Sequence, residues 1–227
     1  PTHPVTDTCP HRVRQLADFA QARADRAGGP VFLVGHSLGG FLSLMCAAQH
    51  PALACGVVMV DSPILGGWRA NTLNMVKRTP LMKSISPGAI SRRRKNTWAH
   101  REAVFEHFRS KKAFAKWDEQ VLHDYIDHGT FDGGEDNRQL SFDRDVETAI
   151  YNTLPHNLAA LLRRHPLKCK AAFIGGRQSV EMKQVGMAMT ERVTKGRITM
   201  LDGSHLFPMV KPLATAAAIE AALRNLL

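Results

Sequence analysis

Short apolar runs alternate with longer amphipathic stretches over most of the chain. Continuous apolar runs predict four buried strands, over residues 30–34, 56–60, 171–174 and 197–201. Hydrophobic positions at helical spacing predict three helices, over residues 12–27, 38–50 and 212–226. Buried strands that are separated by helices are typical of a parallel sheet with helices on both faces. We therefore predict an α/β fold.

Residues 62–166 break this rhythm, because their apolar positions largely follow helical spacing. This pattern predicts a helical lid inserted into an α/β core that comprises residues 1–61 and 167–227. The lid also divides by charge: residues 69–116 hold thirteen Lys or Arg and two acids, whereas residues 118–147 hold ten acids and two Arg. We expect the two halves to offset each other in space.

The composition is that of an ordinary globular protein. Of the 227 residues, 44% are hydrophobic and 22% are charged, which excludes the collagenous and wholly disordered classes. The formal net charge is +10, but no stacking aromatics or recognised binding module accompany the basic run at residues 92–95, so we expect no nucleic-acid partner. The four cysteines are scattered without metal-ligand spacing, so we expect reduced thiols and no metal site.

No segment of the sequence predicts a membrane span or an export signal. The longest apolar stretch, residues 31–48, is interrupted by Gly, His and Ser. Residues 1–21 lack the charged start and the continuous apolar centre of a signal peptide. We therefore expect a cytoplasmic protein.

The segment Gly35-His36-Ser37-Leu38-Gly39 has the pattern Gly-x-Ser-x-Gly between a predicted buried strand and a predicted helix. This context is that of a nucleophile elbow, a tight turn that leaves the serine hydroxyl exposed. We expect Gly35 and Gly39 to avoid side chains that would collide where strand and helix approach. The start of the helix directs the backbone N–H of Leu38 to the place where an acyl oxyanion would form. Ser37 is thus the candidate nucleophile, Leu38 the candidate oxyanion donor, and His36 a packing or hydrogen-bonding residue.

These residues and their order resemble the α/β-hydrolase superfamily, and specifically its serine esterases with a lid. The resemblance covers nearly the whole chain, from the elbow through the strand that ends at Asp61 to the segment Gly203-Ser204-His205 after the last strand. It implies that His205 is the general base, because superfamily members carry a histidine at that place. His205 also follows a predicted strand on the same sheet edge as Ser37, and an imidazole titrates near neutrality.

The acid of the triad has two candidates. Many superfamily members place Asp in the loop after the strand that ends here at Gly176, but this chain carries Gln178 in that loop. A second placement known in the superfamily, at the end of the strand after the nucleophile helix, is occupied by Asp61. The resemblance therefore implies that Asp61 orients His205, with Glu181 as the alternative acid.

The resemblance also implies structure that this sequence lacks. Superfamily members carry four strands ahead of the helix at residues 12–27, together with a loop that supplies the second oxyanion donor. We expect that the sequence is a fragment, or that another chain completes the sheet. Without those strands the predicted strand at residues 30–34 becomes a bare apolar edge, which favours aggregation.

We expect a serine hydrolase that cleaves a carboxylic ester through an acyl-enzyme on Ser37, without a cofactor. The expected substrate is a small, hydrophobic, ester-like molecule. We expect five aromatic residues of the lid to form its apolar core, and in the alternative interpretation they line the substrate pocket. These residues are Trp68, Trp98, Phe105, Phe108 and Tyr151. Two other functions stay open, a catalytically silent binding protein of the same fold and a related acyl-transfer or carbon–carbon bond hydrolase. The oligomeric state stays open too.

Overall fold

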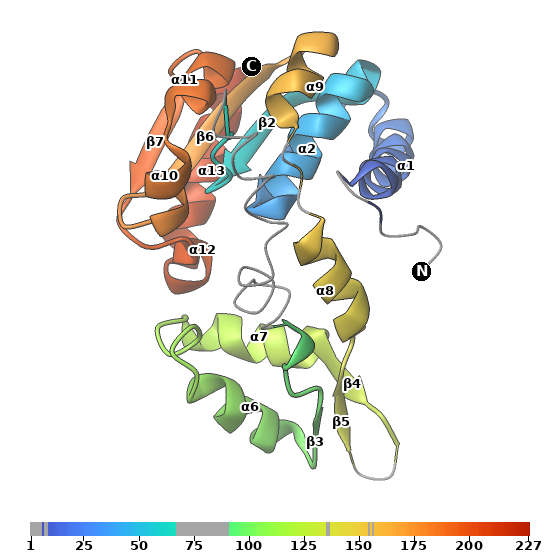
Figure 1. The fold of residues 1–227 in the computed structure, drawn as a ribbon, viewed down its shortest axis with the longest axis vertical. Helices are drawn as coiled ribbons and strands as arrows, with labels where there is room; N and C mark the ends of the chain where they lie inside the picture. Colours follow the sequence, from blue (N-terminus) through green and yellow to red (C-terminus); the bar gives the residue numbers. More distant parts are fainter. Residues whose placement is uncertain (1–5, 7–8, 67–90, 135–136, 154, 156) are drawn as a thin grey trace.

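The computed structural model describes residues 6, 9–66, 91–134, 137–153, 155 and 157–227, and the upper part in Figure 1 is built around a four-stranded sheet. In spatial order the strands are β1 (Val31–His36), β2 (Ala54–Val60), β6 (Lys170–Gly176) and β7 (Ile198–Leu201). Every neighbouring pair is parallel. The predicted α/β class is confirmed, and each of the four predicted strands overlaps an observed one.

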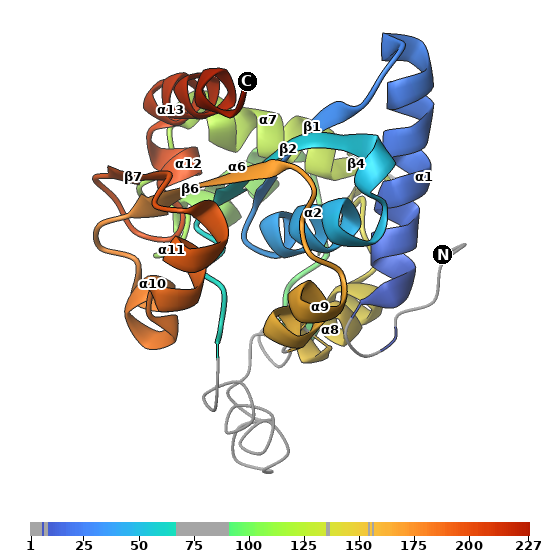
Figure 2. The same cartoon turned by 90° about the horizontal axis from the view of Figure 1, so that it is seen from above.

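Helices cover both faces of this sheet (Figure 2). One face carries α1 (Pro10–Ala27), α2 (Leu38–Gln49), α9 (Leu158–Arg164), α10 (Val180–Val185) and α11 (Ala188–Thr194). The other face carries α12 (Phe207–Val210) and α13 (Pro212–Leu226), while the short turn η1 (Pro51–Leu53) leads from α2 into β2. None of the helices in the described ranges is long and apolar enough to cross a membrane.

The pleat of β2 explains how its side chains pack into two apolar clusters, one on each face of the sheet. Successive side chains point to opposite faces, so Val57 and Met59 pack with α1 and α2 while Val58 and Val60 pack with α13. All four side chains are buried. A strand that is apolar on both faces gives a continuous apolar run, which is why the sequence pattern indicated a parallel sheet.

Between β2 and α9, the described part of the chain forms helices and a small antiparallel sheet. The helices are α6 (Arg101–Arg109), α7 (Glu119–Gly129) and α8 (Arg144–Asn152). The sheet has the order β3-β5-β4, with β3 (Thr97–Trp98), β5 (Arg138–Leu140) and β4 (Thr130–Asp132). The sequence predicted the helical character but not this sheet, because strands of two or three residues are too short to show alternation.

The inserted segment has an apolar core of its own. Its buried members are Trp98, Val104, Phe108, Leu122, Ile126 and Leu140. Of the five aromatic residues expected in the lid, Trp98 and Phe108 lie in this cluster and Phe105 packs against it. Tyr151 lies outside the cluster and is 36% exposed. Trp68 lies outside the described residues.

Two ion pairs join the basic and acidic halves of the insertion. Arg94 Nη1 lies 3.2 Å from Glu147 Oε1, and Arg101 Nε lies 2.5 Å from Asp127 Oδ1. The expected offset of charge is therefore confirmed for these two pairs. Because all four side chains retain contact with solvent, each pair contributes at most about 1 kcal/mol.

Strand β1 forms one end of the central sheet, because β2 is its only neighbour among the described residues. Its outer backbone groups therefore have no partner strand in the described part of the chain. Val34 on this strand is 41% exposed although it is apolar. The bare edge expected for this strand is confirmed in the described residues.

Candidate active site

Ser37 occupies a strained turn between β1 and α2. Its backbone has φ 54° and ψ −120°, outside the regions that residues with side chains prefer. Its N–H donates to the carbonyl of Val60 at 2.9 Å, and its carbonyl accepts from the hydroxyl of Ser62 at 2.7 Å. These bonds to the strand β2 and the loop after it hold the serine in this conformation.

Glycines let the strand and helix of the elbow approach closely. A Cβ atom at Gly35 would collide with the backbone of Gly39, as expected from the elbow pattern. A Cβ at Gly39 itself would meet no atom within 4 Å, so the expectation for this residue was wrong. The second tight position is Gly40, where a Cβ would collide with the side chain of Ser62. The crowding depends on the loop after β2, which the local sequence of the elbow does not reveal.

His205 lies in the loop between β7 and α12 and faces both Ser37 and Asp61. Its Nε2 lies 3.0 Å from Ser37 Oγ. Its Nδ1 lies 2.7 Å from Asp61 Oδ2. When Nδ1 carries the proton and donates it to the carboxylate, Nε2 is left as an acceptor for the serine hydroxyl.

Asp61 follows β2 directly and has its side chain fully buried. Its backbone has φ 46°, and its N–H donates to the carbonyl of Ile174 at 2.7 Å. Oδ1 accepts the N–H of Gly176 at 2.8 Å, and Oδ2 accepts the hydroxyl of Ser179 at 2.6 Å. Burial alone would raise the pKa of Asp61, but the hydrogen bonds to its two oxygens outweigh burial and hold the pKa below its ordinary value. The carboxylate is therefore ionised at neutral pH.

Glu181 reaches the same histidine from α10. Its Oε2 lies 3.9 Å from Nδ1 of His205 and 3.2 Å from the hydroxyl oxygen of Ser179. Its side chain is 47% exposed, in contrast to the buried Asp61. The structure thus brings both candidate acids to His205, with Asp61 at hydrogen-bond distance and Glu181 beyond it.

The environment of His205 favours its charged form. Burial lowers its pKa, but the hydrogen bond to Asp61 and the negative charges of Glu181 and Asp61 outweigh burial, so the pKa lies above its ordinary value. His36 packs beside it, with ring centroids 4.8 Å apart and Nε2 2.8 Å from the carbonyl oxygen of His205. Burial lowers the pKa of His36. His36 thus packs and hydrogen-bonds, as its place in the elbow led us to expect.

No sequence pattern indicated the supporting roles of Gln178 and Ser179. Gln178 donates to Asp202 at 3.0 Å and accepts the N–H of Gly203, which ties the loop after β6 to the loop that carries His205. Ser179 donates to the buried carboxylate of Asp61. Ser and Gln are common loop residues, and only the assembled sheet places these two beside the histidine.

One cluster in the described part of the chain combines three side chains of metal-binding type. The ligand atoms of Asp61, Glu181 and His205 lie within 4.8 Å of one another. The oxygens of Asp61 already accept hydrogen bonds from His205, Gly176 and Ser179. We therefore describe the cluster as a hydrogen-bond network and assign no metal to it.

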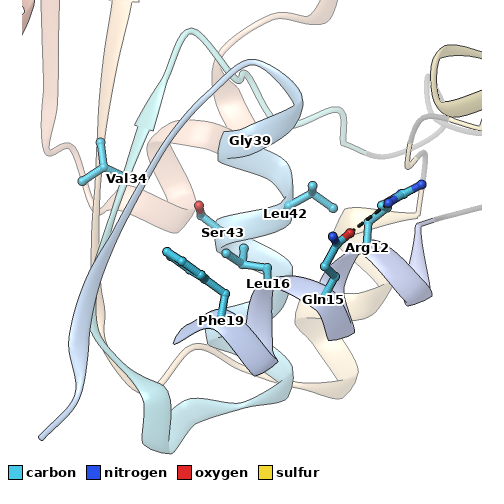
Figure 3. A pocket seen from close by; sticks show the side chains of 8 residues that line it. All are labelled: Arg12, Gln15, Leu16, Phe19, Val34, Gly39, Leu42 and Ser43. Atoms are coloured by element: carbon cyan, nitrogen blue, oxygen red, sulfur yellow. Dashed lines mark hydrogen bonds between the residues drawn. The ribbon is translucent and has the colours of Figure 1, made fainter. Parts of the chain in front are cut away.

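A hollow of about 390 Å³ opens beside the free edge of β1 (Figure 3). It lies between α1, β1 and α2 and is lined by Arg12, Gln15, Leu16, Phe19, Val34, Gly39, Leu42 and Ser43. Ser37, Asp61 and His205 are not among the residues that line it. The hollow therefore belongs to the open edge of the sheet, and we do not assign the substrate to it.

The fold and the site together define a class of protein. A serine on a strand-to-helix turn, a buried acid and a histidine after the last strand, in that chain order on a parallel sheet, are typical of α/β hydrolases. The sequence model of the Alpha/beta hydrolase family matches residues 1–218. The chain belongs to this family.

Individual known proteins are also similar to this chain. The crystal structure of E-2-(acetamidomethylene)succinate hydrolase is similar with a TM-score of 0.72 and 19% identity, over 97% of this chain and 76% of that one. A peroxisomal alpha-beta-hydrolase from Saccharomyces cerevisiae has a TM-score of 0.66 and 15% identity, over 95% of this chain and 60% of that one. Monoglyceride lipase from Homo sapiens is 32% identical over 63 residues, which are 28% of this chain. That matched segment spans 21% of the lipase.

Proposed function

We propose that the protein is a serine hydrolase that cleaves a carboxylic ester through an acyl-enzyme on Ser37. The observation that carries this proposal is the continuous chain from Ser37 Oγ through His205 to Asp61, with separations of 3.0 and 2.7 Å. Such separations suit a nucleophile, its base and the acid that orients the base. Membership of a hydrolase family supports the same class of reaction.

In this mechanism His205 acts first as a base and then as an acid. Its Nε2 takes the proton of the Ser37 hydroxyl as the oxygen attacks the ester carbonyl, and the imidazolium then gives that proton to the leaving alcohol. A water molecule next attacks the acyl-enzyme with the same proton transfers, which releases the carboxylic acid and restores the serine. Asp61 accepts the Nδ1–H throughout, so it fixes the tautomer and stabilises the imidazolium.

The proposed oxyanion donor is the backbone N–H of Leu38, the first residue of α2. The first N–H groups of a helix have no acceptor within the helix, and the helix dipole adds positive potential there. A negative oxygen that develops beside Ser37 is therefore stabilised by this group. One such donor commonly contributes about 10²- to 10³-fold to turnover.

We propose a small, hydrophobic, ester-like substrate and a cytoplasmic location. The similarity to a monoglyceride lipase supports the first part, because a monoglyceride is a hydrophobic carboxylic ester. We further propose that residues 62–166 act as the lid of the site. In support, the N–H of Asp118 at the start of α7 donates to the carbonyl of Met209 in α12, close in sequence to His205, at 2.9 Å.

A fluorophosphonate probe tests the proposed nucleophile, because such a probe reacts with an activated serine and not with ordinary hydroxyls. We expect one label on Ser37 in the folded protein, and no label after Ser37→Ala or after heat denaturation. The variant His205→Ala should label much more slowly, because the hydroxyl has lost its base. A folded protein that stays unlabelled would favour a catalytically silent binding protein. Labelling combined with hydrolysis of other acyl compounds but not of esters would favour a related acyl-transfer or carbon–carbon bond hydrolase.

A further inference from the structure

His205 faces two carboxylates, although a serine, histidine and acid chain uses only one. Oδ2 of Asp61 lies 2.7 Å from Nδ1 of His205, and Oε2 of Glu181 lies 3.9 Å from the same nitrogen. The two acids come from different elements, since Asp61 follows β2 and Glu181 belongs to the first turn of α10. Their convergence on one ring nitrogen is a feature of the tertiary structure.

The hydroxyl of Ser179 lies between these acids and has a single proton. It is 2.6 Å from Asp61 Oδ2 and 3.2 Å from Glu181 Oε2, so the shorter contact takes the proton. The same oxygen accepts the N–H of Met182 at the start of α10. Glu181 therefore gains little from this hydroxyl, and its negative charge stays available to His205.

No lysine or arginine among the described residues forms an ion pair with either carboxylate. The titratable groups that face His205 in the described chain are Asp61 after β2, Glu181 on α10 and His36 at the end of β1. His36 does not offset the acids, because its burial lowers its pKa and favours the neutral ring. In the described chain, the imidazolium of His205 is thus the cation with which both carboxylates interact.

We propose that Glu181 is a positioning residue that acts through His205 as a second carboxylate and stabilises the imidazolium formed when Ser37 gives up its proton. This inference rests on the proposed function. Asp61 holds Nδ1–H by a direct hydrogen bond, and Glu181 adds the attraction of a charge from the solvent side. Because Glu181 is half exposed, its effect is moderate and is screened by salt.

The proposal makes a signed prediction for pH dependence. His205 must be neutral to accept the serine proton, so kcat/KM falls as the pH drops through the pKa of His205. Glu181 raises the pKa of His205, so Glu181→Gln should move this acid limb to lower pH by about 0.3 to 0.7 of a pH unit. The same substitution should lower kcat on the plateau about threefold, with KM little changed, because the lost charge acts on the imidazolium formed in the transition state.

The experiment compares pH profiles of ester hydrolysis by the wild type, Glu181→Gln, Glu181→Asp and Glu191→Gln, at low and high salt. Glu191 is a matched control, because it also lies in the first turn of a short helix, α11, but is not an ion-pair partner of His205. We expect the shift in Glu181→Gln alone, and a profile closer to wild type in Glu181→Asp, which keeps the charge. Added salt should move the acid limb of the wild type towards that of Glu181→Gln and leave the limb of Glu181→Gln in place.

A second measurement, in the His205→Ala variant, distinguishes a role of Glu181 through His205 from a merely structural role. In the His205→Ala variant, Glu181→Gln should leave the residual rate unchanged, because the group through which Glu181 acts is gone. An unshifted acid limb in Glu181→Gln, or an equal loss of rate in the His205→Ala background, would overturn the role of Glu181. Full activity of Ser37→Ala in the same assay would instead overturn the proposed function, so the two failures are distinguishable.

Discussion

Ser37 and Asp61 both hold backbone conformations that are uncommon for residues with side chains, with φ of 54° and 46°. Among the described non-glycine residues only Cys9 and Lys195 also have positive φ. Such conformations cost about 1–3 kcal/mol each and persist where the surrounding structure enforces them. Here these conformations occur at Ser37 and Asp61, whose side chains both lie at hydrogen-bond distance from His205. The strain therefore serves to direct a hydroxyl and a carboxylate at one imidazole.

Removal of the serine hydroxyl should abolish ester hydrolysis with little effect on folding. We expect Ser37→Ala to lower kcat/KM by about 10³-fold or more while the Tm stays nearly unchanged, because the hydroxyl does chemistry and not core packing. His205→Ala should show a comparable loss, and the double variant should be no worse than either single one. The control Ser43→Ala removes a hydroxyl from the same helix and should keep its turnover. Turnover of Ser37→Ala at the wild-type rate would refute the mechanism.

The loss of charge at Asp61 should damage the enzyme far more than the same loss at Glu181. Asp61→Asn removes the negative charge and replaces one acceptor oxygen by an NH2 donor, so Nδ1–H of His205 loses the acceptor that fixes its tautomer, and we expect turnover to fall by about 10³- to 10⁴-fold. Glu181→Gln should cost only a few fold. The measurement is turnover of both purified variants at matched folded fraction, because the buried Asp61 also contributes to stability. Near-normal turnover of Asp61→Asn with a damaged Glu181→Gln would move the acid to α10.

The nucleophile and the base of the candidate site could be predicted from the sequence, but the distances between the site residues could not. Ser37 could be predicted because it lies in a Gly-x-Ser-x-Gly turn, and His205 because it lies in the loop after the last strand. The distances from His205 to Asp61 and Glu181 could not be predicted, because they depend on the positive φ at Asp61 and on how β2 and β6 pair. The position of the Ser179 hydroxyl, which donates to Asp61, depends on the same pairing.

At the scale of elements, the strands of the central sheet were predictable because burial on both faces leaves a continuous apolar run. β2 starts at Ala54, two residues before the predicted start, because Ala54 pairs with Val31 of β1, and such pairing cannot be read from the apolar pattern of one segment. The sheet β3-β5-β4 could not be predicted, since its strands have only two or three residues and the pairing of β3 with β5 joins Thr97 to Gln139 across a long stretch of chain. Local periodicity carries no information on such distant partners.

The junction of β1 and α2 gives a test with a built-in control. Gly35→Ala should destabilise the protein by about 1–3 kcal/mol, because the new methyl group would collide with the backbone of Gly39. Gly39→Ala meets open space within a helix and should change the stability slightly, towards higher Tm. Chemical denaturation of both variants measures the difference. Equal destabilisation by the two substitutions would contradict the close contact described here.

In the molecule as a whole, helices cover both faces of the central sheet, and no strand in the described ranges pairs with the outer edge of β1. The exposed Val34 and the neighbouring Phe19 of α1 make this edge apolar. Unpaired backbone groups on an apolar strand are a template for pairing with another chain. The hollow beside the edge in Figure 3 is a further sign that the described residues leave this side uncovered.

We therefore expect the 227-residue chain, expressed alone, to form oligomers or aggregates. Val34→Lys places a charge on the open edge and should shift the chain towards monomer, whereas Val180→Lys changes an exposed valine on α10 and should not. Size-exclusion chromatography with light scattering measures the outcome. A monodisperse wild-type monomer that unfolds cooperatively would contradict this expectation.

Rapid-quench mass spectrometry of the protein with an activated ester detects the proposed acyl-enzyme on Ser37. We predict a transient mass increase equal to the acyl group, located on the peptide that contains Ser37 and absent in Ser37→Ala. The adduct should decay at the rate of turnover, because water attacks it with the help of His205. Hydrolysis at the wild-type rate with no acylated Ser37 at any time point would rule out the acyl-enzyme mechanism.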